Sequence, residues 1–95
     1  AVEAAIKMAL QYFYNQSKPR TKIIAFRDAY HGDTFGSMSV SARGLFTQPY
    51  QPLLFEVLFV DTPTADNHDT VRAQFQAHIH QHPDSVAAFI FEPLV

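Results

Sequence analysis

The four residues from Tyr30 to Asp33 carry the side chains of this sequence that are best suited to bind a ligand. They follow the apolar run 23–26, which is typical of a buried strand. Side chains that follow a strand lie at the carboxyl edge of a sheet, where open α/β folds bind ligands. Glu92 follows the apolar run 86–91 and would share this edge if the two strands are parallel. The sequence therefore predicts a binding site at one edge of a sheet.

Each residue of this segment also has a purely structural alternative. Tyr30 has a flat ring that can stack on a planar cofactor or can simply pack at the turn. His31 can exchange a proton, or can hold the turn together through hydrogen bonds to the backbone. Gly32 lets the backbone bend tightly or approach a ligand closely, as does Gly36. Asp33 can face a cationic substrate or cap the next helix, and its spacing alone favours the cap.

The other reactive side chains do not form a recognisable site. His78 and His82 would share a helix face, but His80 would point away and the sequence has no Cys, which argues against a metal site. Three His near a helix end are more typical of a solvated terminus. Ser37 and Ser39 lack a neighbouring base, so we do not expect a serine nucleophile. The sequence also has no glycine-rich phosphate loop and no lysine in a setting suited to a Schiff base.

The composition is that of a folded domain with a modest core. The 95 residues are 47% hydrophobic and only 17% charged, which argues against disorder. The net charge of -2 gives no reason to expect binding to nucleic acid or to an anionic membrane. The sequence has no apolar run of membrane-spanning length, and it has no cysteine, which is compatible with an intracellular location.

Hydrophobic periodicity predicts that helices and strands alternate along the chain. We expect helices over residues 1–16, from 33 or 34 to 40, and 68–81. The last of these helices would be capped by Asp66 or Asn67 and would carry Val71, Phe75 and Ile79 on one face. We expect strands over 22–27, 55–60 and 86–91, and a loop over 41–52. Because the strands are apolar on both faces, the fold class is expected to be α/β, with a mainly parallel sheet and flanking helices.

Three segments together resemble class III aminotransferases, which are pyridoxal 5'-phosphate enzymes of fold type I. The segments are residues 1–9 (AVEAAIKMA), 30–40 (YHGDTFGSMSV) and 90–95 (IFEPLV), and their order and spacing cover nearly the whole chain. Tyr-His-Gly with a later Glu-Pro marks the class. Asp33, with Thr-Phe-Gly and Met-Ser-Val after it, resembles the biotin-synthesis branch, which transfers an amino group from S-adenosylmethionine to 8-amino-7-oxononanoate.

The resemblance implies a role for each candidate residue. Tyr30 would stack on the pyridoxal ring and help shape the substrate pocket. His31 and Gly32 would lie beside the cofactor. Asp33 would receive the cationic S-adenosylmethionine, because opposite charges attract strongly in a partly dry pocket. Glu92 would lie beside the cofactor ring, near the Asp that pairs with the pyridine nitrogen.

The resemblance also places several parts of the enzyme outside this sequence. The Schiff-base Lys and the pyridine-pairing Asp are expected beyond Val95, so we expect no catalytic residue within the chain and no activity from it alone. The Gly-Ser turn of the phosphate cup is expected before Ala1, so that the amino end of the first helix would face the phosphate. The family further implies a cytoplasmic homodimer. We interpret residues 1–95 as an internal fragment of the cofactor-binding (large) domain.

Two other functions remain open at this point. One is another class III aminotransferase that acts on an ω-amino acid or a diamine, which an uncharged or basic residue at position 33 would have favoured. The other is a non-catalytic α/β binding module that keeps only the scaffold. In the parent protein, a downstream Asp and then a Lys after a strand would identify an enzyme.

Overall fold

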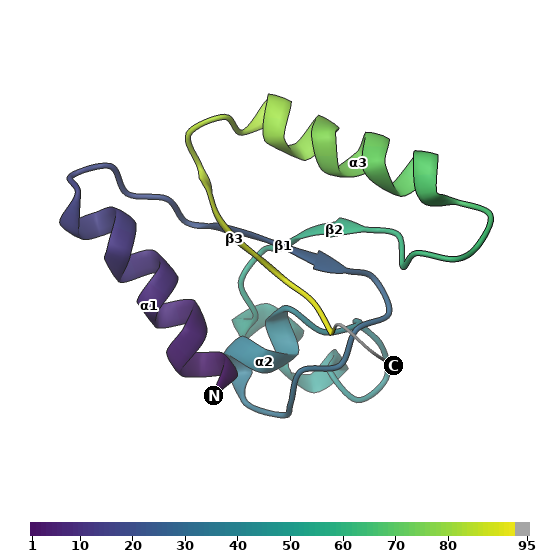
Figure 1. The fold of residues 1–95 in the computed structure, drawn as a ribbon. Coiled ribbons are helices and arrows are strands. Elements are labelled where there is room, and N and C mark those ends of the chain that lie inside the picture. Colours follow the sequence, from purple (N-terminus) through teal and green to yellow (C-terminus); the bar gives the residue numbers. More distant parts are fainter. Residues whose placement is uncertain (93–95) are drawn as a thin grey trace.

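The computed structural model describes residues 1–92. Residues 93–95, which include the proline of the predicted Glu-Pro motif, lie outside the described residues. The elements follow one another as the α-helix α1 (Val2–Asn15), strand β1 (Lys22–Phe26), α2 (Phe35–Ser39), the 3₁₀ helix η1 (Gln48–Leu53), β2 (Leu58–Val60), α3 (His68–Gln81) and β3 (Val86–Ile90) (Figure 1). In this part of the chain, no helix has the length and apolarity needed to cross a membrane.

The three strands form one parallel sheet with β1 in the centre, in the order β2-β1-β3. Ala25 of β1 pairs with Phe59 of β2 on one side and with Ile90 of β3 on the other, and both pairings are parallel. The carboxyl ends of the strands therefore meet at one edge of the sheet. This arrangement confirms the prediction of a parallel α/β sheet.

Helices cover both faces of the sheet, as the apolar strands predicted (Figure 1). On one face, Ile23 and Ala25 of β1 form a buried cluster with Ile6 of α1 and with Val40, which lies just after α2. On the other face lies α3, where edge-to-face aromatic contacts join Phe89 of β3 to Phe26 and Phe75.

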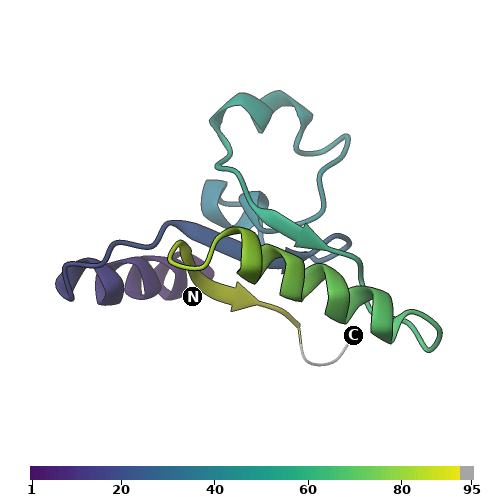
Figure 2. The same cartoon turned by 90° about the horizontal axis from the view of Figure 1, so that it is seen from above.

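The segment between α2 and β2 differs from its prediction. The expected loop 41–52 contains most of η1, which has a proline in its first turn and projects past the β2 edge of the sheet (Figure 2). The strand expected over 55–60 includes only Leu58–Val60. Phe55, the first residue of the expected strand, does not pair with β1. Its N–H donates to Ser39 Oγ at 3.1 Å, and its carbonyl accepts from Arg43 at 2.9 Å.

The residues that cap the starts of α2 and α3 differ in part from the prediction. The N-cap of α2 is Thr34, so Asp33 does not act as the cap that its spacing favoured. The N-cap of α3 is Asn67, but its side chain makes no capping bond. It instead accepts from the Thr64 N–H at 2.7 Å and so closes the preceding turn. On the predicted apolar face of α3, Ile79 remains 39% exposed.

Candidate functional site

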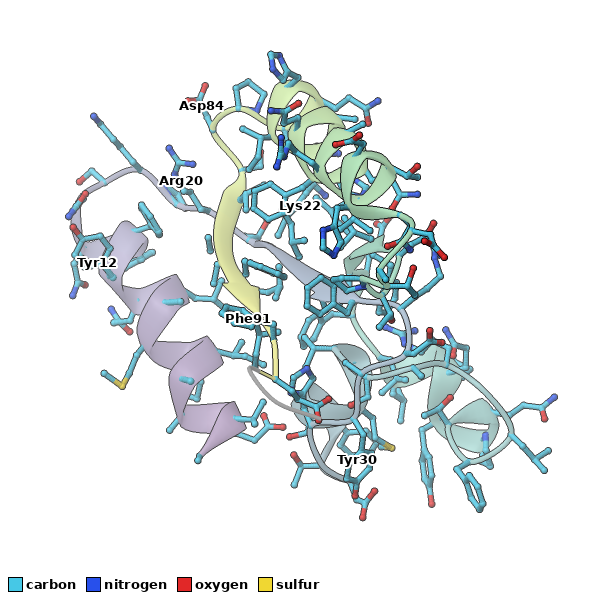
Figure 3. All side chains as sticks on the ribbon, turned by 45° about the vertical axis from the view of Figure 1, so that its right-hand side comes forward. Tyr12, Arg20, Lys22, Tyr30, Asp84 and Phe91 are labelled. Atoms are coloured by element: carbon cyan, nitrogen blue, oxygen red, sulfur yellow. The ribbon has the colours of Figure 1, made fainter. Side chains whose placement is uncertain are left out.

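The two predicted halves of the site meet at the carboxyl edge of the sheet. The backbone N–H of Tyr30 donates to Glu92 Oε1 at 3.0 Å, although the two residues are 62 positions apart. Figure 3 shows Tyr30 beyond the carboxyl ends of the strands, whereas Arg20 and Asp84 lie at the opposite end of the sheet. The structure therefore brings Glu92 and the Tyr30 segment together, as the parallel arrangement predicted.

The side chain of Tyr30 is available to a ligand but is also tied to Asp33. Its exposed fraction is 62%, so most of the residue can contact another molecule. The phenol hydrogen bonds to the Asp33 carboxylate, and this bond, together with partial desolvation and the negative charge of Asp33, raises the pKa of Tyr30. The phenol therefore stays protonated at neutral pH and helps to hold the Asp33 carboxylate in place.

His31 has a fixed backbone and an unsatisfied ring. Its N–H donates to Ser41 Oγ at 2.8 Å, and the same hydroxyl donates to the Ser37 carbonyl at 2.7 Å. Within the described residues, the buried Nε2 atom of His31 has no hydrogen-bond partner. Buried polar nitrogens are normally paired, so this atom is suited to contact a group that residues 1–92 do not supply.

Gly32 occupies a position that other residues tolerate poorly. Its φ of 136° lies in the region that favours glycine. A Cβ atom there would also lie 3.1 Å from both Cβ and Oγ of Ser37, which is a tight contact. Gly32 is therefore needed for the turn that carries Tyr30 and Asp33.

We expect Gly32→Ala to destabilise the full-length protein by about 1–3 kcal/mol, because the new methyl group forces a strained backbone. Gly44→Ala is the matched control, since a Cβ at Gly44 meets nothing within 4 Å. Thermal unfolding should show a lower midpoint for the Gly32 variant and an unchanged midpoint for the control. Equal midpoints for both variants would show that the turn does not require glycine.

Asp33 lies between two neighbouring hollows. The first has a volume of about 360 Å³ and is lined by Tyr30, Gly32 and Asp33 among others. The second has a volume of about 520 Å³, and it shares Asp33, Met38 and Phe46 with the first. Asp28 also lines the first hollow, whereas Asp33 is the one carboxylate among the residues that line the second. A largely apolar hollow with a carboxylate at its wall suits a ligand with both an apolar part and a positive charge.

The buried serines of this region act as structural cross-links. Ser39 Oγ donates to the Phe35 carbonyl at 2.7 Å and accepts from the Phe55 N–H at 3.1 Å. Ser41 Oγ likewise joins the His31 backbone to α2. Because backbone groups occupy the hydroxyls of Ser39 and Ser41, these two side chains join separate segments of the chain around the site.

Sequence reasoning missed Glu3, which contacts the site from α1. Its carboxylate accepts from the Thr34 hydroxyl and from the Ser37 N–H, the latter at 2.9 Å. The hydrogen bond with Thr34 is the main cause that lowers the pKa of Glu3, so this carboxylate is charged at neutral pH. An acid in the first turn of a helix is common and indicated only a favourable helix dipole, not this contact.

The histidines near the end of α3 do not form a metal site. His78 Nε2 lies 2.8 Å from the carbonyl oxygen of Phe59, which occupies this ring nitrogen. Across residues 1–92, no three His, Cys, Asp or Glu side chains are placed to hold a metal ion together.

Comparisons with known proteins agree with this architecture. The chain is 50% identical to the adenosylmethionine-8-amino-7-oxononanoate aminotransferase of Synechococcus elongatus and 34% identical to that of Geobacter sulfurreducens, with the whole chain aligned in both cases. The alignments include 24% of each relative, so the chain spans about a quarter of their length. The crystal structure of the Methanocaldococcus jannaschii enzyme of the same name matches 95% of this chain and 20% of that chain, with a TM-score of 0.80 and 36% identity.

The family assignment rests on the full length of the sequence. The sequence model described as "Aminotransferase class-III" matches residues 1–95. Residues of the three segments that carried the resemblance meet in the structure, because Glu3 bonds to Thr34 and Ser37 and the Tyr30 N–H bonds to Glu92. The chain therefore belongs to the class III aminotransferase family.

Proposed function

We propose that this chain is an internal part of the cofactor-binding domain of a pyridoxal-phosphate-dependent aminotransferase in biotin synthesis. The parent enzyme would transfer an amino group from S-adenosylmethionine to 8-amino-7-oxononanoate and so form 7,8-diaminononanoate. The observation that carries this proposal is the meeting of Tyr30, Asp33 and Glu92 at one sheet edge. Identity of 50% to the Synechococcus enzyme of that name supports it.

The residues at this edge suit pyridoxal phosphate. The exposed ring of Tyr30 offers a surface on which a planar ring can stack, and Gly32 adds no side chain beside it. The unpartnered Nε2 of His31 provides a polar contact in the same turn. When bound, the cofactor supplies the electron sink and carries the amino group between the two substrates.

Each residue would have a defined task around the cofactor. Tyr30 would stack on the ring and exclude water from one side of it. Glu92 would lie beside the cofactor ring. Its bond to the Tyr30 N–H would hold the backbone of Tyr30 in place at the edge of the sheet. The amino end of α1 would face the phosphate group. The lysine that binds the cofactor and moves the proton would come from outside this sequence.

Asp33 would recognise the amino donor. S-adenosylmethionine carries a sulfonium and an ammonium group, and a carboxylate at the wall of a largely apolar hollow, such as Asp33, attracts such a cation. The Tyr30 phenol would keep this carboxylate oriented, because it hydrogen bonds to it. The same tyrosine would thus serve both the cofactor and the donor.

Product analysis of the purified full-length protein with pyridoxal phosphate tests this function. We expect 7,8-diaminononanoate to form from 8-amino-7-oxononanoate when S-adenosylmethionine is the donor, and not when an ω-amino acid or a diamine replaces it. Turnover with one of the other donors alone would assign the chain to a different class III activity. No turnover with any donor would favour a binding protein that keeps the scaffold.

The proposal includes a cytoplasmic homodimer whose interface involves the projecting patch, which we define as Leu45, Phe46, Tyr50 and Leu53. These side chains are 43–91% exposed and belong to the segment that extends past the β2 edge of the sheet (Figure 2). A second copy of the protein would cover this apolar patch, since exposed apolar clusters mark interaction surfaces. The cysteine-free sequence agrees with a cytoplasmic location.

Leu45→Glu is expected to weaken the dimer by at least about tenfold, because it buries an unpaired charge in the interface. Leu45 is 79% exposed and has no hydrogen-bonding role, so its replacement leaves the fold of the subunit intact. Sedimentation of the full-length protein over a range of concentrations measures the effect, with Leu45→Met as the control. An unchanged dissociation constant for the Glu variant would remove the patch from the interface.

A further inference from the structure

The side chain of Glu3 joins the start of α1 to the start of α2, which lie next to each other in Figure 1. Its Oε1 atom accepts from the Ser37 N–H at 2.9 Å and from the Thr34 hydroxyl, and the Gly36 N–H also bonds to this carboxylate. The first N–H groups of a helix have no partner within the helix. Glu3 therefore satisfies donors of α2 with a charged group from a distant segment.

Gly36 leaves room for the Glu3 carboxylate because it has no side chain. A Cβ atom at Gly36 would lie 2.6 Å from Glu3 Oε1 and 2.7 Å from its Cδ. Both separations are shorter than real Cβ contacts, so any side chain at position 36 would push the carboxylate away. The glycine and the acid, from two different helices, thus fit each other.

Thr34 connects this anchor to the proposed donor site. It is the N-cap of α2, yet its side chain makes no capping bond to the helix. Its hydroxyl instead donates to Glu3 and lies 3.0 Å from Ser37 Oγ. Asp33 is the next residue towards the amino end, and its carboxylate is held on the other side by the Tyr30 phenol. The position of Asp33 therefore depends on the bond between Thr34 and Glu3.

We propose that Glu3 is a positioning residue for Asp33, and that it sets the affinity of the enzyme for its cationic amino donor. This inference rests on the proposed function, because Asp33 is the donor-binding group only in that function. Glu3 acts through Thr34 and α2 and does not itself contact the donor. Its removal would release the start of α2 and let the Asp33 carboxylate move away from its place beside Tyr30.

The kinetic test uses Glu3→Ala and Glu3→Gln in the full-length holoenzyme. We expect Glu3→Ala to raise the KM for S-adenosylmethionine by about tenfold, because a charge-assisted anchor is lost, while the KM for 8-amino-7-oxononanoate stays within about twofold. Glu3→Gln keeps an acceptor oxygen and should recover most of the loss. Glu56→Ala is the matched control, since Glu56 is an exposed acid outside the site. Equal rises in both KM values would overturn the proposal.

A second test reads the position of Asp33 without any substrate. The Asp33 carboxylate raises the pKa of Tyr30, so this pKa should fall towards its ordinary value in Glu3→Ala. Titration of ¹³C-labelled tyrosine by NMR measures it, with the signal assigned from Tyr30→Phe. An unchanged Tyr30 pKa would overturn the proposal.

The two measurements also separate this inference from the proposed function. If the wild-type enzyme does not accept S-adenosylmethionine, the proposed function fails, but the tyrosine titration still decides the role of Glu3. If Glu3→Ala does not fold, Thr34→Val replaces it in both experiments, because it removes only the hydroxyl that bonds to Glu3. The same donor-specific rise in KM and the same fall in the Tyr30 pKa are then expected.

Discussion

Tyr30→Ala in the full-length protein is expected to lower both half-reactions by on the order of 100-fold, because each requires a correctly held cofactor. The substitution removes the exposed ring on which the cofactor would stack and also the phenol that holds Asp33. Single-turnover rates with each substrate measure the two losses. Retention of pyridoxal phosphate during dialysis measures the weaker cofactor binding directly.

Tyr30→Phe separates the two tasks of this side chain. It keeps the ring, so cofactor retention should match that of the wild type. It loses the bond to Asp33, so the half-reaction with S-adenosylmethionine should fall more than the half-reaction with the acceptor. Wild-type rates and cofactor retention in Tyr30→Ala would show that this residue only packs at the turn.

Asp33→Asn is expected to reduce kcat/KM for the half-reaction with S-adenosylmethionine by on the order of 100-fold, since a charge that faces a cation is lost. The half-reaction with 8-amino-7-oxononanoate should change by less than about threefold, because that effect would come only from altered packing. The Asn side chain has nearly the same shape, so the turn at Gly32 should remain intact. Stopped-flow measurement of each half-reaction gives the two values.

Asp84→Asn is a matched control for this substitution. It makes the same chemical change at the opposite end of the sheet from Tyr30 (Figure 3). We expect both half-reactions of this variant to equal those of the wild type. If Asp33→Asn slows both half-reactions equally, Asp33 has a general structural role and another group recognises the donor.

The parallel sheet and its functional edge could be predicted from the sequence because both depend on local patterns. Apolar strands that alternate with helices favour a parallel sheet, and the residues just after parallel strands lie together at one edge. The bond between the Tyr30 N–H and Glu92 agrees with that reasoning across 62 residues. Local patterns also gave the bounds of α3 correctly.

Other features could not be predicted, because they depend on contacts between distant segments. The Ser37 N–H in the first turn of α2 bonds to Glu3, which lies 34 residues earlier in the chain, and no local signal near Asp33 indicates this contact. The strand β2 starts late because Phe55 bonds to Ser39 and Arg43 instead of to β1. In each case a tertiary hydrogen bond overrides the local preference of the chain.

The absorbance spectrum of the full-length protein with pyridoxal phosphate, before and after the addition of S-adenosylmethionine, tests most directly whether this site belongs to an aminotransferase with that donor. We predict a band of the bound cofactor that is replaced by the band of its aminated form when S-adenosylmethionine is added. A cofactor band that ignores S-adenosylmethionine but responds to an ω-amino acid or a diamine would contradict the proposed donor. The absence of any cofactor band would contradict the proposed chemistry as a whole.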